Sequence, residues 1–193
     1  MLKVVGSVVL FCAVVCKISA MVKPTSGGHK YELEIQKVLP MNDTDYVVFK
    51  GLKVKRYNRT FYVADGEFVI NGEFNDSWTV EAYCWRSKLG NNQWELTSFK
   101  TPPQKVSQFL KDIYIPHIQP DVCPYSNLPA FEDKEAENIF PGGDYKIENY
   151  VGDIQNFPPH LQDGVYRIEI FIALDGQVLS GFIIYWKVYP EVG

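Results

Sequence analysis

The last part of the chain alternates apolar and polar residues over two long segments that a tight turn connects. Residues 165–174 and 177–189 form the two arms, and Asp175-Gly176 lies between them. A two-residue turn needs positive φ angles, which an Asp-Gly pair adopts readily, so this pattern predicts a β-hairpin. The second arm is apolar on both faces, which predicts a central strand or one wall of a ligand cavity.

Shorter segments of the same kind come earlier, at residues 31–35, 52–56, 61–63, 68–70 and 78–84. Strands with one buried face show this period, so the chain is predicted to be mostly β. Asp65-Gly66 and Asn71-Gly72 are further turn pairs, but they lie too close together for both to connect full hairpins. We expect one of them to be a bulge inside a long strand, and the sequence leaves open which one.

One helix is predicted among the strands, over about residues 102–114. Thr101 offers an N-cap hydroxyl, Pro102 suits the first helical position, and Pro116 is expected to end the helix. Four apolar residues repeat at helical spacing on one face, namely Val106, Phe109, Leu110 and Ile113. This face is expected either to pack over a sheet or to form a lid over a ligand cavity, in which case Phe109 would contact the ligand.

Residues 1–20 have the pattern of a secretory signal peptide. Lys3 precedes an apolar run over residues 4–15, and polar and small residues follow it up to Ala20. The apolar run is shorter than the roughly 20 residues that a membrane-spanning helix needs. We therefore expect cleavage after Ala20 and an extracellular protein; the alternative is a buried N-terminal strand.

The rest of the chain is expected to form a loose leader over 21–28 and a single domain over 29–193. Its aromatic content of 15% is enough to fill a large core or to line an apolar cavity. Lysine and arginine form no basic stripe along the sequence, so no nucleic acid is expected as a partner.

Cysteine usage agrees with secretion. Cys12 and Cys16 would leave with the signal peptide, so Cys84 and Cys123 would remain. Two cysteines in an oxidising compartment are expected to pair, and only one intramolecular connectivity is possible. The sequence therefore predicts a disulfide between Cys84 and Cys123; the alternative is two free buried thiols.

Three Asn-X-Ser/Thr sequons follow the predicted signal peptide. Their acceptor residues are Asn42, Asn58 and Asn75, and none has proline in the middle position. All three lie at expected turns or strand ends, where a bulky glycan can be accommodated. We expect at least one of them to carry a glycan.

The sequence shows no catalytic constellation. The three histidines, His29, His117 and His160, lie in no nucleophile or metal-binding motif. Carboxylate pairs such as Asp163 and Glu169 arise by chance at this density of acidic residues, so they carry no specific signal. The chain is therefore not expected to be an enzyme, and neither a cofactor nor a metal is expected.

Three segments of the chain resemble, in order, those of an insect family of secreted chemosensory proteins, the CheA/CheB-like group. Residues 53–68 resemble its Asn-Arg-Thr segment. Cys123-Pro124 followed by residues 140–145 resembles its Cys-Pro and Pro-X-Gly-X-Tyr segment, and residues 158–167 resemble its Pro-X-X-Leu-X-X-Gly-X-Tyr/Trp segment. That family is similar to the ganglioside activator protein and to the MD-2-related lipid-recognition proteins.

The resemblance implies a cup-shaped antiparallel β-sandwich whose apolar interior holds a lipid tail or a hydrophobic semiochemical. The expected function is that of a secreted, non-enzymatic binding protein in insect chemosensation. Its expected partners are the ligand and a receptor or membrane surface, and it is expected to be a monomer. The mammalian activator has more disulfides than this chain can form, so its glycolipid specificity is not carried over.

The final hairpin and the helix supply the residues expected to contact the ligand, which are Phe109, Phe171, Phe182, Ile184 and Trp186. The alternative function is a secreted protein-interaction module with a filled core and no small ligand. The two functions differ in whether the interior is hollow, and a cavity lining and a packed core use the same residue types.

Overall fold

The computed structural model describes residues 31–42, 44–59, 62–132, 139–151 and 160–190. The predicted signal peptide, the leader and His29 lie outside these ranges. Within them the chain forms eight strands: β1 (Tyr31–Asn42), β2 (Val47–Arg56), β3 (Tyr62–Ile70), β4 (Trp78–Ser87), β5 (Glu95–Lys105), β6 (Gly143–Tyr150), β7 (Gly164–Leu174) and β8 (Gln177–Pro190).

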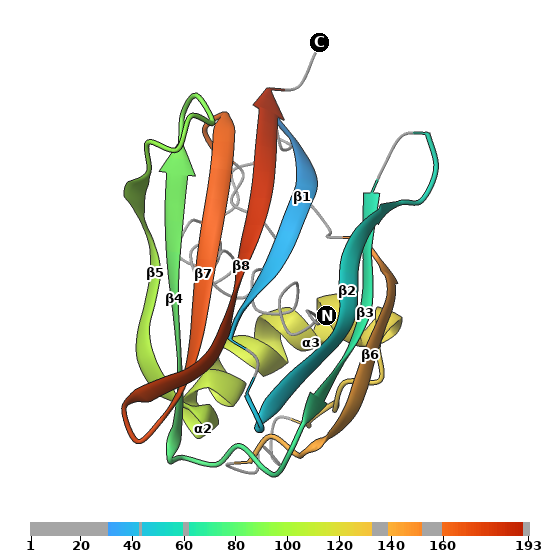
Figure 1. Ribbon diagram of the computed structural model, residues 1–193, viewed down its shortest axis with the longest axis vertical. Helices are drawn as coiled ribbons and strands as arrows, with labels where there is room; N and C mark the ends of the chain where they lie inside the picture. The colour runs from blue at the N-terminus through green and yellow to red at the C-terminus, as the bar shows by residue number, and fades with distance from the viewer. Residues whose placement is uncertain (1–30, 43, 60–61, 133–138, 152–159, 191–193) are drawn as a thin grey trace.

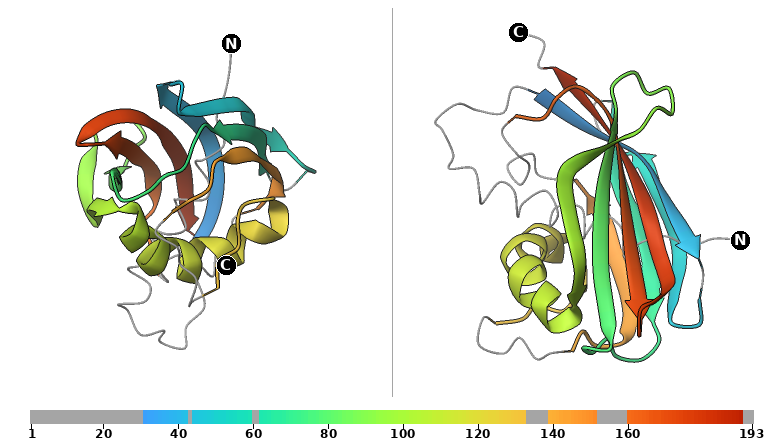
Figure 2. Two further views of the ribbon diagram at one scale, coloured as in Figure 1. Left: turned by 90° about the horizontal axis from the view of Figure 1, so that it is seen from below. Right: turned by 90° about the vertical axis from the view of Figure 1, so that its left-hand side faces the viewer.

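The strands form two antiparallel sheets that face one another (Figure 1), which confirms the predicted β-sandwich or cup. The larger sheet has the order β1-β8-β7-β4-β5 and the smaller one the order β2-β3-β6. β1 contacts β2 on one side of the sandwich. Figure 2 shows a helical segment lying across the other side, from β5 toward β6.

The final hairpin forms as predicted. β7 and β8 pair along their whole length, and Asp175 and Gly176 connect them with φ angles of 50° and 80°. β8 lies between β1 and β7, so it is a central strand, which is one of the two alternatives that its apolar faces predicted. Its inward residues are buried and its outward apolar residues, Ile183, Tyr185 and Tyr189, are half-buried.

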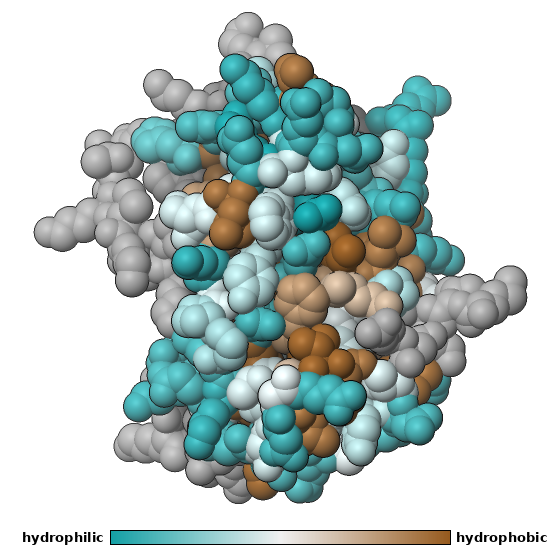
Figure 3. All heavy atoms as spheres, turned by 60° about the vertical axis from the view of Figure 1, so that its left-hand side comes forward, coloured by the Kyte–Doolittle hydropathy of each residue, from teal (hydrophilic) through white to brown (hydrophobic). Residues whose placement is uncertain are grey.

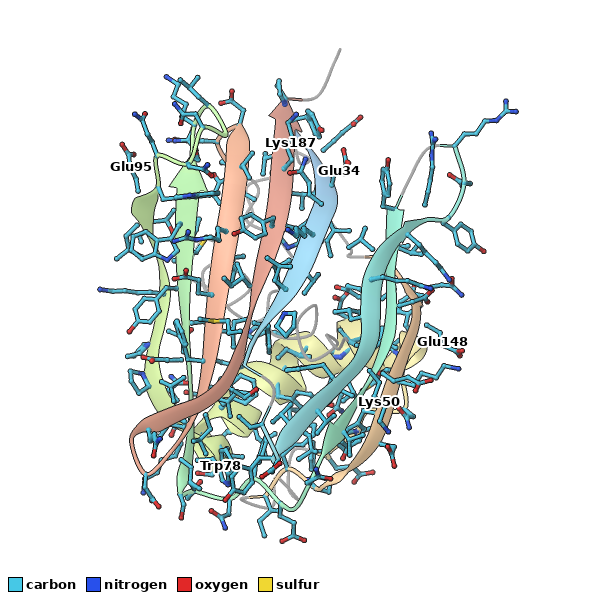
Figure 4. All side chains as sticks on the ribbon, in the orientation of Figure 1. Glu34, Lys50, Trp78, Glu95, Glu148 and Lys187 are labelled. Carbon is cyan, nitrogen blue, oxygen red and sulfur yellow. The ribbon has the colours of Figure 1, made fainter. Side chains whose placement is uncertain are left out.

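Charged side chains lie on the outer faces of both sheets (Figure 4). Lys50 and Glu148 belong to the smaller sheet and Lys187 to the larger one, and each lies beside a buried residue in its strand. Because successive residues of a strand point to opposite faces, this alternation directs the apolar residues between the sheets.

Asp65-Gly66 lies within β3, opposite a bulge in each neighbouring strand, so the sequence pair marks the irregular position although the extra residues belong to β2 and β6. The pairing advances by three residues in β2 and in β6 while β3 advances by two. The register between β3 and β6 shifts between Ala64 and Gly66, and Gly66 has a φ of 155°. The Asp65 carboxylate accepts a hydrogen bond of 2.6 Å from the backbone N–H of Asn149, which stabilises the irregular position. Asn71-Gly72 lies instead in the connection from β3 to β4.

The helical segment exists but has different bounds from those predicted. It covers residues 106–125 as α2 (Val106–Phe109), the π-helix η1 (Leu110–Ile118), α3 (Gln119–Val122) and the 3₁₀-helix η2 (Cys123–Tyr125). Thr101 and Pro102 belong to β5. A residue before proline is disfavoured in the α region, and proline is tolerated on an edge strand such as β5.

The start of the helical segment is capped by a residue from another part of the chain. Lys105, at the N-cap position, makes no side-chain cap. Asp76, in the β3–β4 connection, accepts hydrogen bonds of 2.9 Å from both the backbone N–H and the hydroxyl of Ser107. The carboxylate therefore satisfies a helix N–H that the local sequence leaves without a partner.

Pro116 does not end the helical segment. A proline ring in an α-helix clashes with the carbonyl four residues earlier and removes one hydrogen bond. The turns around Pro116 are π-helical, with i→i+5 spacing in place of i→i+4, and the chain continues as a helix beyond them.

Candidate ligand cavity

A cavity of about 80 Å³ lies between the two sheets, next to the start of the helical segment. Its lining consists of aliphatic and aromatic side chains: Val47, Phe49, Phe68, Ile70, Phe74, Val80, Val106, Phe109, Tyr114, Leu128, Phe140, Ile172 and Phe182. The described lining therefore offers a guest apolar contacts.

Each wall of the cavity follows from the local pattern of its element. In β2 and β3 the alternating residues that point inward reach the cavity, for example Phe49 and Phe68. On the helical side, Val106, Phe109 and Tyr114 lie on one face at helical spacing, so all three reach the same cavity. The predicted apolar helix face is thus buried.

Aromatic rings contact one another across and around the cavity. Phe49 of the smaller sheet meets Phe182 of the larger sheet edge-to-face, with ring centroids 6.2 Å apart. Tyr114 meets Phe140 in the same way at 5.5 Å. Edge-to-face pairs add favourable electrostatics to apolar burial, so these contacts stabilise the lining.

The one polar atom of the lining side chains is already bonded. The Tyr114 hydroxyl donates a hydrogen bond of 2.6 Å to the carbonyl oxygen of Pro129. Burial is the main cause that raises the pKa of Tyr114 above its ordinary value, so the phenol stays neutral. Among the residues that the structure describes, no charged side chain lines the cavity. A charged head group buried there would therefore find no partner, which costs several kcal/mol.

Two of the five predicted ligand contacts line the cavity. They are Phe109 on α2 and Phe182 on β8. Ile184 and Trp186 are buried on the same face of β8, but they pack in the core beyond the cavity lining.

Phe171 was wrongly assigned to the inner wall. Ile170, its neighbour in β7, is buried, and Ile172 lines the cavity, so Phe171 points to the opposite face of the sheet. There its ring lies 6.1 Å from that of Tyr83.

The sequence analysis missed lining residues that come from irregular segments. Phe74 and Phe140 pair through two backbone hydrogen bonds of 2.9 and 2.8 Å, which hold both rings against the cavity. Leu128 lies in the proline-rich stretch after the helical segment. None of the three lies in a segment with a period of two or 3.6, so their apolar character was the sole signal.

The outer face of the larger sheet carries a second group of aromatic residues. The Arg167 guanidinium lies 5.5 Å from the ring of Trp85 and 4.8 Å from that of Trp94. Glu169 pairs with Arg167 at 3.2 Å and accepts a hydrogen bond of 2.7 Å from the Trp85 indole. Tyr185 meets Trp94 edge-to-face. Figure 3, with the β5 side of the molecule brought forward, shows hydrophobic side chains among hydrophilic ones.

The predicted disulfide is not formed in the structure. Cys84 and Cys123 are both free thiols. Cys84 is buried in β4 beside Thr97, whereas the Cys123 sulfur lies 3.8 Å from the carbonyl oxygen of Leu128 and 3.9 Å from the Tyr114 hydroxyl. The two sulfurs therefore contact different segments. Burial raises the pKa of Cys84 to about 12 and also raises that of Cys123.

Two of the three sequon asparagines have side chains that the structure describes as exposed. Asn58 and Asn75 are exposed, and Asn42 is the last residue of β1. The Asn75 side-chain oxygen accepts a hydrogen bond of 2.9 Å from the backbone N–H of Ser77. Glycosylation at these positions stays a prediction.

The described ranges contain no cluster of three or more His, Cys, Asp or Glu side chains that could hold a metal ion. In the same part of the chain, no helix is long and apolar enough to cross a membrane. Asp163 and Glu169, the pair ascribed to chance, have different partners, because Asp163 lies beside Arg86 and Glu169 beside Arg167.

The chain matches no known protein-family model, and a comparison with curated proteins finds no significant match. The resemblance of residues 53–68, 140–145 and 158–167 to insect chemosensory proteins is therefore carried by those segments alone and stays a prediction.

Proposed function

We propose that this protein is a secreted, non-enzymatic binding protein that holds a lipid or another hydrophobic small molecule between its two sheets. One observation carries the proposal: the interior contains a cavity whose lining side chains are all aliphatic or aromatic. The resemblance to secreted chemosensory proteins supports a hydrophobic semiochemical as the guest, with a receptor or membrane surface as a further partner.

The chemistry of the lining determines which part of a guest can enter. Burying a methylene group yields roughly 0.8 kcal/mol, so a hydrocarbon gains affinity with each buried carbon. A carboxylate or an ammonium group would lose its hydration without gaining a partner. We therefore expect uncharged hydrocarbon segments to bind inside and polar groups to stay outside.

A binding assay with an uncharged fluorescent probe tests this function. N-phenyl-1-naphthylamine should gain fluorescence on mixing with the protein, and long-chain hydrocarbons should displace it. Phe182→Trp fills part of the cavity and should weaken binding of the probe. Phe171→Trp changes the outer face of the same sheet and should leave the affinity for the probe unchanged. If the wild type takes up no probe, the proposal is wrong.

The aromatic group around Arg167 favours the second candidate function, a secreted protein-interaction module. Interfaces are enriched in tryptophan, tyrosine and arginine, and Trp85, Trp94 and Tyr185 gather there on an outer sheet face that is usually polar. Absence of probe uptake, together with loss of binding to a partner protein after Trp94→Ala, would favour this second function.

A further inference from the structure

The cavity in its present form is small for the proposed guests. Its volume of about 80 Å³ is roughly half of the 150 Å³ of an engineered protein cavity that binds benzene. Apart from the half-buried Ile172, its lining residues are at most 9% exposed. A longer hydrocarbon therefore needs one wall of the cavity to move.

Most walls are held by regular hydrogen-bond ladders. β2 and β3 pair with each other, and β8 pairs with strands on both of its sides. The helical wall is anchored by Leu110, Ile113 and Ile118, which are at most 1% exposed. Phe74 and Phe140 are held to one another by two backbone hydrogen bonds. Moving any of these walls would disrupt the core.

The wall without such backbone pairing is the segment Leu128–Phe131, which we name the strap. Leu128 lines the cavity. The strap carbonyl of Pro129 accepts from the Tyr114 hydroxyl at 2.6 Å. The Gln119 side chain pairs with the backbone of Phe131, donating to its carbonyl at 3.0 Å and accepting from its N–H at 2.8 Å.

These contacts have one feature in common: a side chain of the helical segment holds the strap backbone. Within the part of the chain that the structure describes, residues 128–131 belong to no strand and to no backbone hydrogen-bonded pair. The nearby Cys123 is a free thiol, so it makes no covalent bond to another segment. Releasing the strap costs these three hydrogen bonds and the weak contacts of the Cys123 thiol with the carbonyl oxygens of Leu128 and Pro129, all of which water can replace, together with exposure of Leu128 and Phe131.

We propose that the strap is the movable wall of the cavity and that a guest larger than the resting cavity binds by displacing it. The hydrogen bonds of Tyr114 and Gln119 then determine which fraction of the protein molecules has the strap displaced and can bind a guest. The inference rests on the proposed binding function and names how that site is controlled. When the form with the displaced strap is a minor one, the apparent Kd equals the intrinsic Kd of that form divided by the fraction of molecules in it.

Tyr114→Phe tests the inference, because it keeps the ring that lines the cavity and removes the hydroxyl that holds Pro129. Loss of one neutral hydrogen bond should raise the open population about fivefold, so N-phenyl-1-naphthylamine should bind about fivefold more tightly. The gain should appear in the association rate measured by stopped-flow fluorescence. A merely structural tyrosine would give unchanged or weaker binding.

Tyr166→Phe is the matched control. Its hydroxyl donates to the carbonyl oxygen of Gln162 at 2.9 Å, a bond of the same kind outside the strap and the cavity lining. Probe affinity should stay at the wild-type value in this variant. An equal gain in both variants would mean that general loosening of the fold admits the probe, and would overturn the inference.

Gln119→Ala provides an independent variant if Tyr114→Phe does not fold, because Gln119 is half-buried and lies outside the cavity lining. It should also tighten probe binding, and wild-type affinity in the folded variant would contradict the strap's role. If neither the wild type nor any variant binds the probe, the binding function itself fails. If all bind it equally, the function stands and the strap inference is wrong.

Discussion

The two sides of the cavity are lined by similar side chains but held in different ways. Phe182 belongs to β8, which is hydrogen-bonded to a neighbouring strand on each side. Leu128 belongs to the strap, which is held by the side chains of Tyr114 and Gln119. The difference is that one wall is part of a backbone ladder and the other is not, although both are buried. The proposed movement of the strap rests on this difference.

Truncation of the sheet wall should have the largest effect on stability. Phe182 is 1% exposed and contacts Phe49 across the sandwich, so Phe182→Ala should lower the free energy of unfolding by about 3–5 kcal/mol. Phe171→Ala makes the same change on the half-buried outer face and should cost about 1 kcal/mol. Urea denaturation measures both, and equal losses would contradict the assignment of the two faces.

Truncation on the helical side should cost somewhat less. Phe109 is buried on α2, so Phe109→Ala should lower the free energy of unfolding by about 3 kcal/mol, at the low end for a core phenylalanine. This loss is expected because the helical face packs in the core, in contrast to a lid. A loss below about 1 kcal/mol with a large change in probe dissociation rate would restore the lid interpretation.

The Asp76 cap at the start of the helical segment should make a smaller contribution to the free energy of unfolding, and this contribution should depend on pH. The hydrogen bond from the Ser107 side chain is the main cause that lowers the pKa of Asp76. A lowered folded-state pKa stabilises the fold above the unfolded-state value of about 4, and the contribution is lost as the pH falls through the folded-state pKa.

Asp76→Ala should therefore cost about 1 kcal/mol at neutral pH, because it removes the acceptor of both Ser107 hydrogen bonds. The difference from the wild type should shrink below about pH 4, where the wild-type carboxylate becomes protonated. Denaturation curves at several pH values check this, and a difference that stays constant down to pH 2 would argue against the cap.

The smallest expected effect is a difference in reactivity between the thiol on the sheet side and the thiol near the strap. Cys84 is 1% exposed in the sheet, whereas Cys123 is half-buried beside the strap. Iodoacetamide at mildly alkaline pH should modify Cys123 several-fold faster than Cys84, because exposure limits the reaction and burial keeps both thiols protonated. Peptide mass spectrometry over time measures which cysteine is modified first. Detection of a disulfide-linked peptide pair would instead restore the predicted disulfide.

The elements predicted correctly are those with a regular local pattern. The alternation over 165–189 and Asp175-Gly176 predicted a hairpin and a central strand, and the structure contains both. The helix face of Val106 and Phe109 was predicted from its spacing and is buried. The helix bounds were wrong, because the cap comes from Asp76, about thirty positions earlier in the chain, and Pro116 is accommodated by π-helical turns.

The sequence by itself determined the two-face alternation of the strands, the turn at Asp175-Gly176 and the apolar side of the helical segment. These features depend on neighbours within a few positions, and such neighbours are fixed by backbone geometry. The tertiary structure alone decided which apolar residues surround a void and which fill the core. It brought Phe74, Leu128 and Phe140 together with Phe182 from distant segments, and it separated Cys84 from Cys123. Contacts of this kind depend on how the two sheets and the helical segment pack, so no local spacing in the chain specifies them.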